Sequence, residues 1–253
     1  MIPPSCLEMS WGTYWFDEID STSLEAARRA SEGQTGPFWI AAKKQTKGRG
    51  RLGRNWVSET GNLYATALVP IEKVDANLPS IALTLGLSVR DAFLGLSGET
   101  CDPRVKWPND VRIDGAKISG ILIETGNTPD GQGWISFGIG LNLSFSPDIA
   151  NYRTTSLLAE SGVSVSPEDA LGALDRALRQ RLRQHIHVGR QSIIDDWLEA
   201  TDQHGQICRT QQNGVEVEGL FLGLDDYGQM QLQTENGETR TISAGDVELV
   251  GRR

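Results

Sequence analysis

The sequence predicts an α+β protein with a mixed, mainly antiparallel sheet, flanking helices and a small β barrel at the C-terminal end. Short apolar runs bounded by glycine, proline or turn residues recur between residues 14 and 143, as expected for strands. Residues 78–96 carry apolar side chains at helical spacing, and the segment 166–169 (SPED) is a strong start for a second long helix. After Gly205 only short β runs separated by turn residues remain.

Composition limits the function classes. A chain of 253 residues can hold one large and one small domain, each with its own core, and Gly205 suggests a division into 1–204 and 205–253. The net charge of −9 argues against general nucleic-acid binding, because phosphate contacts need a broad cationic surface. Three widely spaced cysteines indicate free thiols in a reducing cytosol. Residues 1–10 do not resemble a secretory signal, and the apolar runs are shorter than a membrane span, so we expect a cytoplasmic protein.

The first third of the chain alternates strands with one helix. The helix is expected over residues 20–33, where Thr22 and Glu25 stand at capping-box spacing. Apolar runs predict three strands, at residues 14–19, 38–42 and 63–69.

A long helix and a series of hairpin strands are expected next. The helix over residues 78–96 ends at Ser97-Gly98, and Asp114-Gly115 is a turn signal between two short β runs. The polar segment 126–133 joins two longer strands that should pair antiparallel. The strands are predicted at residues 104–107, up to Pro108, and at 111–113, 118–124 and 134–143.

The C-terminal part should contain two helices and a barrel. The helices are expected over residues 167–188 and 192–200. Short β runs then lie around Ile207, Val215, Leu220, Met230, Thr239 and Val247. Turn signals separate them, at Asn213-Gly214, Asp226-Tyr227-Gly228 and Asn236-Gly237. This spacing predicts an SH3-like all-β barrel.

Residues 43–56, KKQTKGRGRLGRNW, are the most distinctive stretch. They hold six cations, three glycines and no acid in a chain that is acidic as a whole. Gly48, Gly50 and Gly53 allow backbone conformations that bring N–H groups close to an anion. The arginines between these glycines can present planar donors to phosphate or carboxylate oxygens. The stretch therefore predicts a binding loop for an anionic ligand, and a solvated basic loop is the alternative.

Four motifs in this order make the chain resemble the biotin protein ligases. They are GRGRxGR in the basic loop, KWPND at residues 106–110, K-x-x-G-I-L-x-E from Lys117 to Glu124, and G-x-G-x-N ending at Asn142. The resemblance spans about residues 20–250 and implies a class II synthetase-like catalytic domain. It implies an enzyme that activates biotin with ATP and Mg²⁺ to biotinyl-5′-AMP. The acceptor would be a lysine of the biotin carboxyl carrier domain of acetyl-CoA carboxylase or a related carboxylase.

The resemblance also assigns a biotin pocket. It places the segment 21–23 against the ureido ring of biotin, with Ser23 standing where the family usually has asparagine. Gly120 and Leu122 would border an apolar slot for biotin, which a larger residue at position 120 would block. The implied biotin-binding residues are Ser21, Thr22, Ser23, Gln45, Gly48, Arg49, Gly50, Arg51, Lys117, Gly120 and Leu122.

Activation of a carboxylate by ATP is opposed mainly by repulsion between anions, so cations and positioning should carry the catalysis. The resemblance implies that Arg49, Arg51 and Lys117 bind the carboxylate oxygens of biotin and the α-phosphate oxygens of ATP. It makes Asp110 the group that orients or deprotonates the acceptor lysine. The implied ATP-binding residues are Arg51, Arg54, Trp56, Lys106, Asn109, Lys117 and Asn142. Asn142 can pair with the edge of adenine. Trp56 can stack on that ring, and a tryptophan of the core is the alternative. No protein metal site is expected.

The basic loop should be mobile when empty, because nothing within it offsets its charge repulsion, and a ligand should order it as a lid. Other functions fit less well. A lipoate or octanoate ligase would share the fold, but GRGRxGR together with KWPND favours biotin. A biotin-responsive repressor needs a helix-turn-helix, and only about twenty residues precede Ser21. A phosphate- or RNA-binding module would need cations spread over a face, and the P-loop pattern is absent. We expect a monomer or homodimer without nucleic-acid or membrane partners.

Overall fold

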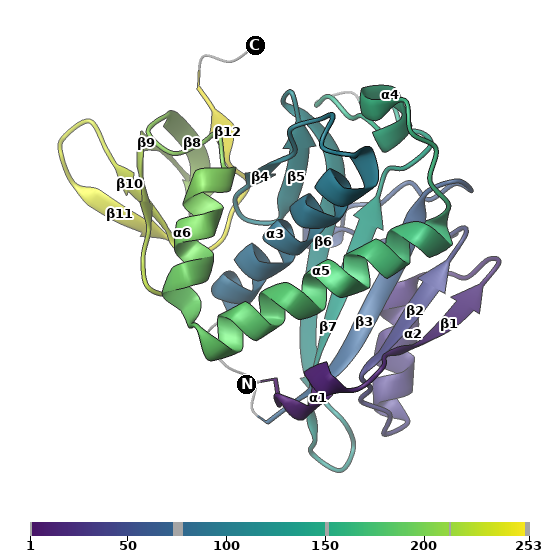
Figure 1. Ribbon diagram of the computed structural model, residues 1–253. Helices are drawn as coiled ribbons and strands as arrows, with labels where there is room; N and C mark the ends of the chain where they lie inside the picture. The colour runs from purple at the N-terminus through teal and green to yellow at the C-terminus, as the bar shows by residue number, and fades with distance from the viewer. Residues whose placement is uncertain (1, 73–77, 150–151, 213, 251–253) are drawn as a thin grey trace.

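The computed structural model describes residues 2–72, 78–149, 152–212 and 214–250. A seven-stranded sheet carries helices on both faces, and a five-stranded β domain packs at one end (Figure 1). The predicted α+β fold class is therefore confirmed. The turn expected at Asn213-Gly214 begins at a residue that lies outside the described residues.

The large sheet has the strand order β1-β2-β3-β7-β6-β5-β4. Among the described residues only β1 and β2 run parallel, and the other neighbouring strands are antiparallel, as predicted. The central strands β3 and β7 are buried along almost their whole length, because helices cover both faces. The strands are β1 Gly12–Phe16, β2 Phe38–Ala42, β3 Leu63–Ile71, β4 Arg104–Lys106, β5 Asp110–Ile113, β6 Ala116–Asn127 and β7 Gly133–Leu141.

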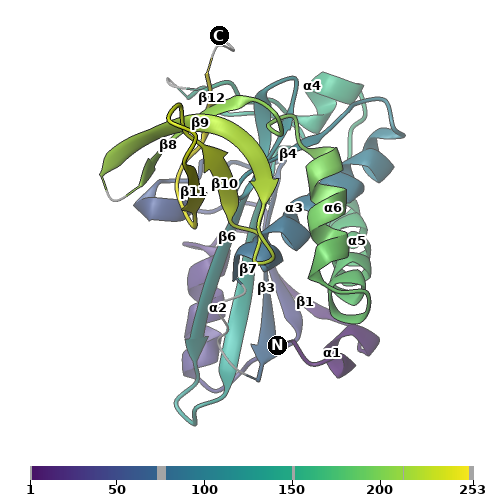
Figure 2. The same ribbon diagram turned by 90° about the vertical axis from the view of Figure 1, so that its left-hand side faces the viewer.

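The helices form two layers. α3, α5 and α6 pack on one face of the sheet and α2 lies on the other (Figures 1 and 2). The sequence pattern did not predict α1 or α4, since helices of four and five residues are too short to show a period. The helices are α1 Ser5–Glu8, α2 Thr22–Ser31, α3 Leu78–Ser97, α4 Leu157–Ser161, α5 Pro167–His187 and α6 Arg190–Ala200.

The long helix α3 corrects the expectation that every apolar run is shorter than a membrane span. Among the described residues it is the one helix long and apolar enough to cross a membrane, with 20 residues and a mean hydropathy of 1.2. However, 61% of that stretch is buried, and the helix packs against α5, α6 and the sheet. A largely apolar surface is what a mostly buried position between two helices and a sheet requires.

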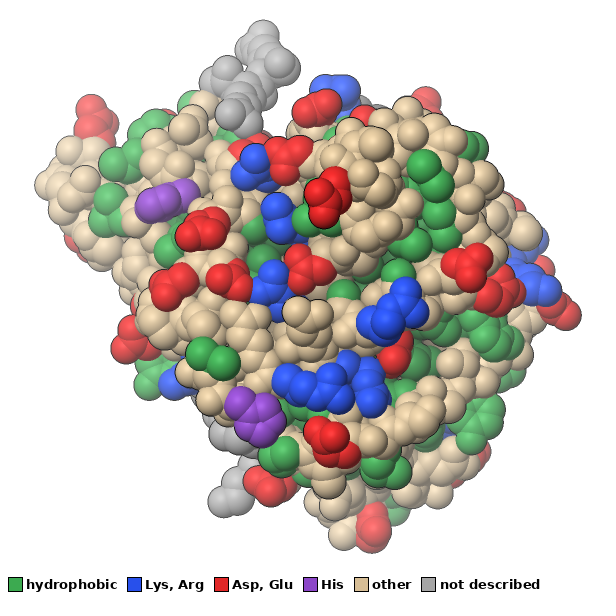
Figure 3. Space-filling model, in the orientation of Figure 1, with side chains coloured by type: hydrophobic (Ala, Val, Ile, Leu, Met, Phe, Trp, Pro, Cys, Tyr) green, Lys and Arg blue, Asp and Glu red, His purple; other side chains and the backbone are tan. Residues whose placement is uncertain are grey.

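Ion pairs tie the helices of this layer together. Arg181 of α5 contacts Asp91 of α3 at 2.6 Å and also pairs with Asp196 of α6. Figure 3 shows the same face of the molecule, where basic and acidic side chains lie interspersed over the helices.

The C-terminal β domain is an antiparallel sheet of order β11-β10-β9-β8-β12. Val215 and Leu220, expected in separate strands, belong to the single strand β9. The expectation of a separate core is wrong, because the buried side chains of this domain continue the cluster of the large sheet. The indole Nε1 of Trp107 donates to the carbonyl of Gly228 at 3.1 Å across the junction. The strands are β8 Ile207–Gln212, β9 Val215–Leu224, β10 Met230–Gln233, β11 Thr239–Ile242 and β12 Glu248–Leu249.

The start of α2 also differs from the prediction. Ser21 is the N-cap and Thr22 is already helical, so Thr22 and Glu25 do not form a capping box. Thr22 instead turns its hydroxyl toward Gln45, and Glu25 pairs with two arginines of its own helix. The polar side chains at this helix start are thereby available to a pocket.

Candidate active site

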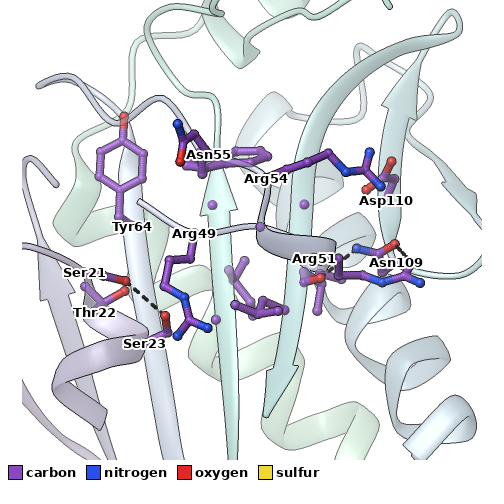
Figure 4. A pocket seen from close by; sticks show the side chains of 18 of the residues that line it. Ser21, Thr22, Ser23, Arg49, Arg51, Arg54, Asn55, Tyr64, Asn109 and Asp110 are labelled. Carbon is purple, nitrogen blue, oxygen red and sulfur yellow. Dashed lines mark hydrogen bonds between the residues drawn. The ribbon is translucent and has the colours of Figure 1, made fainter. Parts of the chain in front are cut away.

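A pocket lies between the start of α2, the loop 43–56 and the strands β3, β7 and β6 (Figure 4). The hollow encloses about 720 Å³ when the solvent space at its open mouth is included. The structure brings most of the predicted site residues to its wall. These are Ser21, Thr22, Ser23, Gln45, Arg49, Gly50, Arg51, Arg54, Trp56, Asn109, Asp110, Lys117, Gly120 and Leu122.

The wall also contains residues that sequence reasoning did not assign to the site. They are Asn55, Tyr64, Thr66, Ile121, Gly138, Ile139, Gly140, Tyr152 and Asp246. Gly138 and Gly140 stand in the fourth motif, so a signal for them existed. Thr66 pairs in register with Gly138 on the neighbouring strand, which only the sheet pairing reveals. Asp246 arrives from the C-terminal domain.

Uncharged polar groups build one end of the pocket. The backbone N–H and the hydroxyl of Thr22 both donate to Gln45 Oε1, at 2.8 and 3.2 Å. Gln45 Nε2 donates to Ser58 Oγ at 2.9 Å, and Thr66 Oγ1 donates to Thr22 Oγ1 at 2.8 Å. These bonds fix the orientation of the Gln45 amide, and the neighbouring hydroxyls of Ser21 and Ser23 lie 3.0 Å apart. Such a preorganised set of neutral donors and acceptors suits a neutral polar ring.

The basic loop folds back on itself as a tight hairpin. Trp56 donates its backbone N–H to Gly48, and Gly50 donates to Arg54 at 2.8 Å. The turn between them places Leu52 at φ 55° and Gly53 at φ 72°. A side chain at Gly48 would meet the Trp56 carbonyl at 2.2 Å, so only glycine fits at the base of the hairpin.

Acidic residues outside the basic loop pair with its arginines. From the sequence we expect a mobile loop, because nothing within it offsets the repulsion between its cations, and this expectation does not include the outside partners. Arg49 Nη2 lies 3.1 Å from Glu124 Oε1 on β6. Arg54 pairs with Asp246 of the C-terminal domain. These acids are far away in sequence, so the local pattern of cations could not show them.

Arg51 is the most enclosed arginine of the loop. Its Nη1 donates to Asn109 Oδ1 at 2.6 Å, and Asn109 Nδ2 in turn donates to the Ile121 carbonyl at 2.7 Å. Desolvation lowers the pKa of Arg51, partly offset by the nearby Asp246 and Asp110, although a guanidinium remains protonated in proteins. Asn109 therefore fixes a half-buried cation at the pocket wall.

Lys117 reaches the pocket from β6, independently of the loop. Its Nζ lies 2.7 Å from Asp110 Oδ1, and both side chains are less than a fifth exposed (16% and 18%). The ammonium also faces the rings of Trp56 and Tyr152, at 5.5 and 5.7 Å from their centres. The pocket thus joins cations from two separate segments, and the Asp110 carboxylate lies beside one of them.

Trp56 fills the space that the glycines of the strands leave open. Cβ atoms built at Gly120 and Gly140 would lie 2.7 and 2.4 Å from its ring. These two glycines face each other in the β6–β7 register, so together they form a flat seat for the indole. In this structure the Trp56 ring therefore lies against Gly120 and fills part of the space predicted for biotin.

Three predicted site residues do not line the pocket. Gly48 is buried at the base of the loop hairpin. Lys106 is largely enclosed, and desolvation lowers its pKa, with Asp110 opposing the shift. Asn142 is 2% exposed and donates Nδ2 to the Thr155 carbonyl at 3.0 Å, while its Oδ1 has no hydrogen-bond partner among the described residues. Asn142 therefore keeps one free acceptor but lies behind the wall.

Comparison with known proteins agrees with this fold. Residues 15–142 match the model of the biotin/lipoate A/B protein ligase family, and residues 204–250 match the biotin protein ligase C-terminal domain. A biotin--[acetyl-CoA-carboxylase] ligase of Paracoccus denitrificans is 32% identical over 238 residues, covering 92% of this chain and 98% of the relative. A ligase of the same name from Mycobacterium tuberculosis is 30% identical, with 91% and 86% covered.

A solved structure is similar over nearly the whole chain. The biotin protein ligase from Aquifex aeolicus in complex with biotin and ATP has a TM-score of 0.79 at 27% identity. The alignment covers 94% of this chain and 98% of that one. The chain therefore belongs to the biotin/lipoate A/B protein ligase family, and its C-terminal match places it among the biotin protein ligases.

Proposed function

We propose that this protein activates biotin with ATP to biotinyl-5′-AMP and then transfers biotin to one lysine of a carrier domain. The observation that carries the proposal is the single pocket in which Arg49, Arg51 and Lys117 converge from two segments beside a neutral polar end. Two small anions need such cations if they are to meet. The neutral end suits the uncharged ureido ring of biotin.

The biotin end is assigned to the Thr22–Gln45–Thr66 network and the adjacent Ser21 and Ser23 hydroxyls. All of these groups are fixed by hydrogen bonds before a ligand arrives, which lowers the entropic cost of binding. Leu122 and Ile121 supply apolar wall between this end and the cations. The ring would lie among the hydroxyls, and the carboxylate would point toward the basic loop.

The first reaction places the biotin carboxylate against the α-phosphate. Arg51 and Lys117 are the cations best enclosed, so each acts at low local dielectric on the charge that develops there. Arg54 stands at the outer wall, where Asp246 holds it, and is assigned to the remaining phosphates. Through this pair the segment 205–253 contributes to a site built by 1–204, and we retain these as the two domains.

Asp110 is assigned to the transfer step. A lysine amine of normal pKa is protonated near pH 7 and must lose a proton before it attacks. The Asp110 carboxylate lies in the pocket wall beside Lys117, at the place where the mixed anhydride would form. Movement of Lys117 toward the phosphate would leave the carboxylate free to accept that proton.

We propose that Mg²⁺ accompanies ATP. Magnesium is commonly held by one or two carboxylates together with substrate phosphates, and Asp246 and Asp110 both line the pocket. The described residues hold no group of three or more metal-binding side chains, so the phosphates would be its main ligands. When bound, the ion supplies charge neutralisation of the phosphates.

The nucleotide base is assigned to the side of Trp56 and Asn142. The Asn142 Oδ1 that lacks a partner could accept from the exocyclic amine of adenine if the intervening wall shifts. Trp56 offers a flat ring beside it. The carrier substrate is proposed to be the biotin carboxyl carrier domain of acetyl-CoA carboxylase or a related carboxylase, in the cytoplasm.

The testing experiment is biotin-dependent exchange of pyrophosphate into ATP by the whole chain. We expect exchange with biotin and none above background with lipoate or octanoate, since the neutral polar end matches a ureido ring. Exchange that depends on lipoate instead would refute the choice of substrate. No exchange with any of the three acids would refute the adenylation step.

A further inference from the structure

Glu124 of β6 has no part in the reaction described above, yet it contacts the basic loop. Its Oε1 lies 3.1 Å from Arg49 Nη2, across the gap between the sheet and the hairpin. Arg49 lines the pocket and extends toward Ser23 at the neutral end (Figure 4). The ion pair therefore joins the loop to the sheet at the end of the pocket assigned to biotin.

The hairpin can transmit this contact. Gly48 and Trp56 are bonded to each other at its base, and Arg49 and Asn55 form the next bridge above them. Fixing the Arg49 side chain therefore restrains the whole hairpin rather than one residue. The Arg54–Asp246 pair restrains the other side, next to the C-terminal domain.

Nothing else in the described residues explains the Glu124 carboxylate. Its second oxygen, Oε2, is buried without a hydrogen-bond partner among them, so the group is not part of a wider structural network. The contact uses one terminal nitrogen of Arg49 and leaves the other guanidinium N–H groups for a ligand. When one nitrogen of the guanidinium is held by Glu124, the other N–H groups keep a fixed direction. Binding a ligand then costs less side-chain entropy than it would with an unrestrained arginine.

We propose that Glu124 is a positioning residue that acts through Arg49, as a latch that holds the basic loop closed over the neutral end of the pocket. The effect on the loop does not depend on any ligand. The consequence for biotin rests on the proposed function. Because both side chains are partly exposed (40% and 27%), breaking the pair should change rates by about two- to fivefold.

The loop itself is tested by tryptic cleavage after Arg51 and Arg54 in the ligand-free protein. We expect Glu124→Gln to speed this cleavage about two- to fivefold, since opening of the loop limits access. In an Arg49→Gln background, the same change at Glu124 should have no further effect. The matched control is Glu218→Gln, which breaks the exposed Arg209–Glu218 pair at 2.7 Å on the C-terminal sheet. Equal acceleration by Glu124→Gln in both backgrounds, or in the control, would overturn the latch.

The consequence for biotin is measured as KM and kcat in pyrophosphate exchange. We expect Glu124→Gln to raise the KM for biotin about two- to fivefold with kcat unchanged, and to do so only when Arg49 is present. A lowered KM would mean that Glu124 competes with the ligand for Arg49, and would overturn the proposal. If the wild-type protein shows no pyrophosphate exchange, the proposed function is refuted. The rates of tryptic cleavage would still show whether Glu124 holds the loop closed.

Discussion

Replacement of Lys117 by methionine tests the cationic site with the least disturbance of shape. Lys117 Nζ is enclosed by Asp110, Trp56 and Tyr152, and 16% of its side chain is exposed, so little water can take its place. Removing one preorganised donor from such a site costs about 10²–10³ in kcat, or roughly 3–4 kcal/mol. Arg51 cannot replace it readily, because it is tied to Asn109.

The same change has a predictable effect on stability. Without Lys117 the Asp110 carboxylate, 18% exposed, lacks its ion-pair partner, which should cost about 1–3 kcal/mol. Adding Asp110→Asn removes that charge, so the double variant should recover most of the lost stability. Activity should not recover, which separates the catalytic effect from the structural one.

The assay is pyrophosphate exchange at saturating biotin and ATP, with urea unfolding beside it. Lys43→Met is the control, because it removes a cation of the same sequence stretch whose Asp17 ion pair is exposed and outside the pocket. We expect the control to retain wild-type exchange. Exchange by Lys117→Met within threefold of wild type would refute the role of Lys117 in adenylation.

Four further predictions follow from the site and the core. Asp110→Asn should slow transfer from supplied biotinyl-5′-AMP more than it slows exchange, and an equal loss in both half-reactions would reject Asp110 as the base. Gly140→Ala would place Cβ about 2.4 Å from the Trp56 ring. The displaced ring should reduce adenylate formation at least tenfold, roughly the 1.4 kcal/mol of a modest overpacking cost. An unaltered rate would show that the packing of Trp56 on the two glycines does not matter for adenylation. Asp246→Asn should raise the KM for ATP without changing the KM for biotin. A raised KM for biotin with an unchanged KM for ATP would mean that the C-terminal domain contacts the biotin end of the pocket, contrary to the assignment. Burial lowers the pKa of His185 to about 4, so the stability linked to its neutral form is fully present above pH 6.5 and is lost as the pH falls toward 4. His185→Gln should flatten the dependence of the unfolding free energy on pH in urea titrations. An unchanged dependence would show that His185 does not cause it.

The elements that support the pocket could be predicted because their signals are local. Residues 38–42 and the helix from Leu78 carry the apolar patterns of a buried strand and a core helix, and both formed at the expected positions. The N-cap at Ser166 was equally clear, and its Oγ accepts from the Asp169 N–H at 3.0 Å. Capping at Thr22 failed because tertiary contacts with Gln45 replaced the local bonds.

The partners of the charged residues could not be predicted in the same way. Asp246 lies 192 residues from Arg54, and Glu124 lies 75 residues from Arg49, so no spacing rule connects them. The seat of Trp56 depends on the β6–β7 register, which brings glycines of two motifs face to face. The motifs identified which residues gather at the pocket, whereas the pairing of strands decided which of them touch.

The most direct measurement is a crystal structure of the protein with biotinyl-5′-AMP. We predict the ureido ring beside Thr22 and Gln45, and the phosphate within hydrogen-bond distance of Arg51 and Lys117. A ligand bound elsewhere, with both cations still held by Asn109 and Asp110, would contradict the assignment of this pocket.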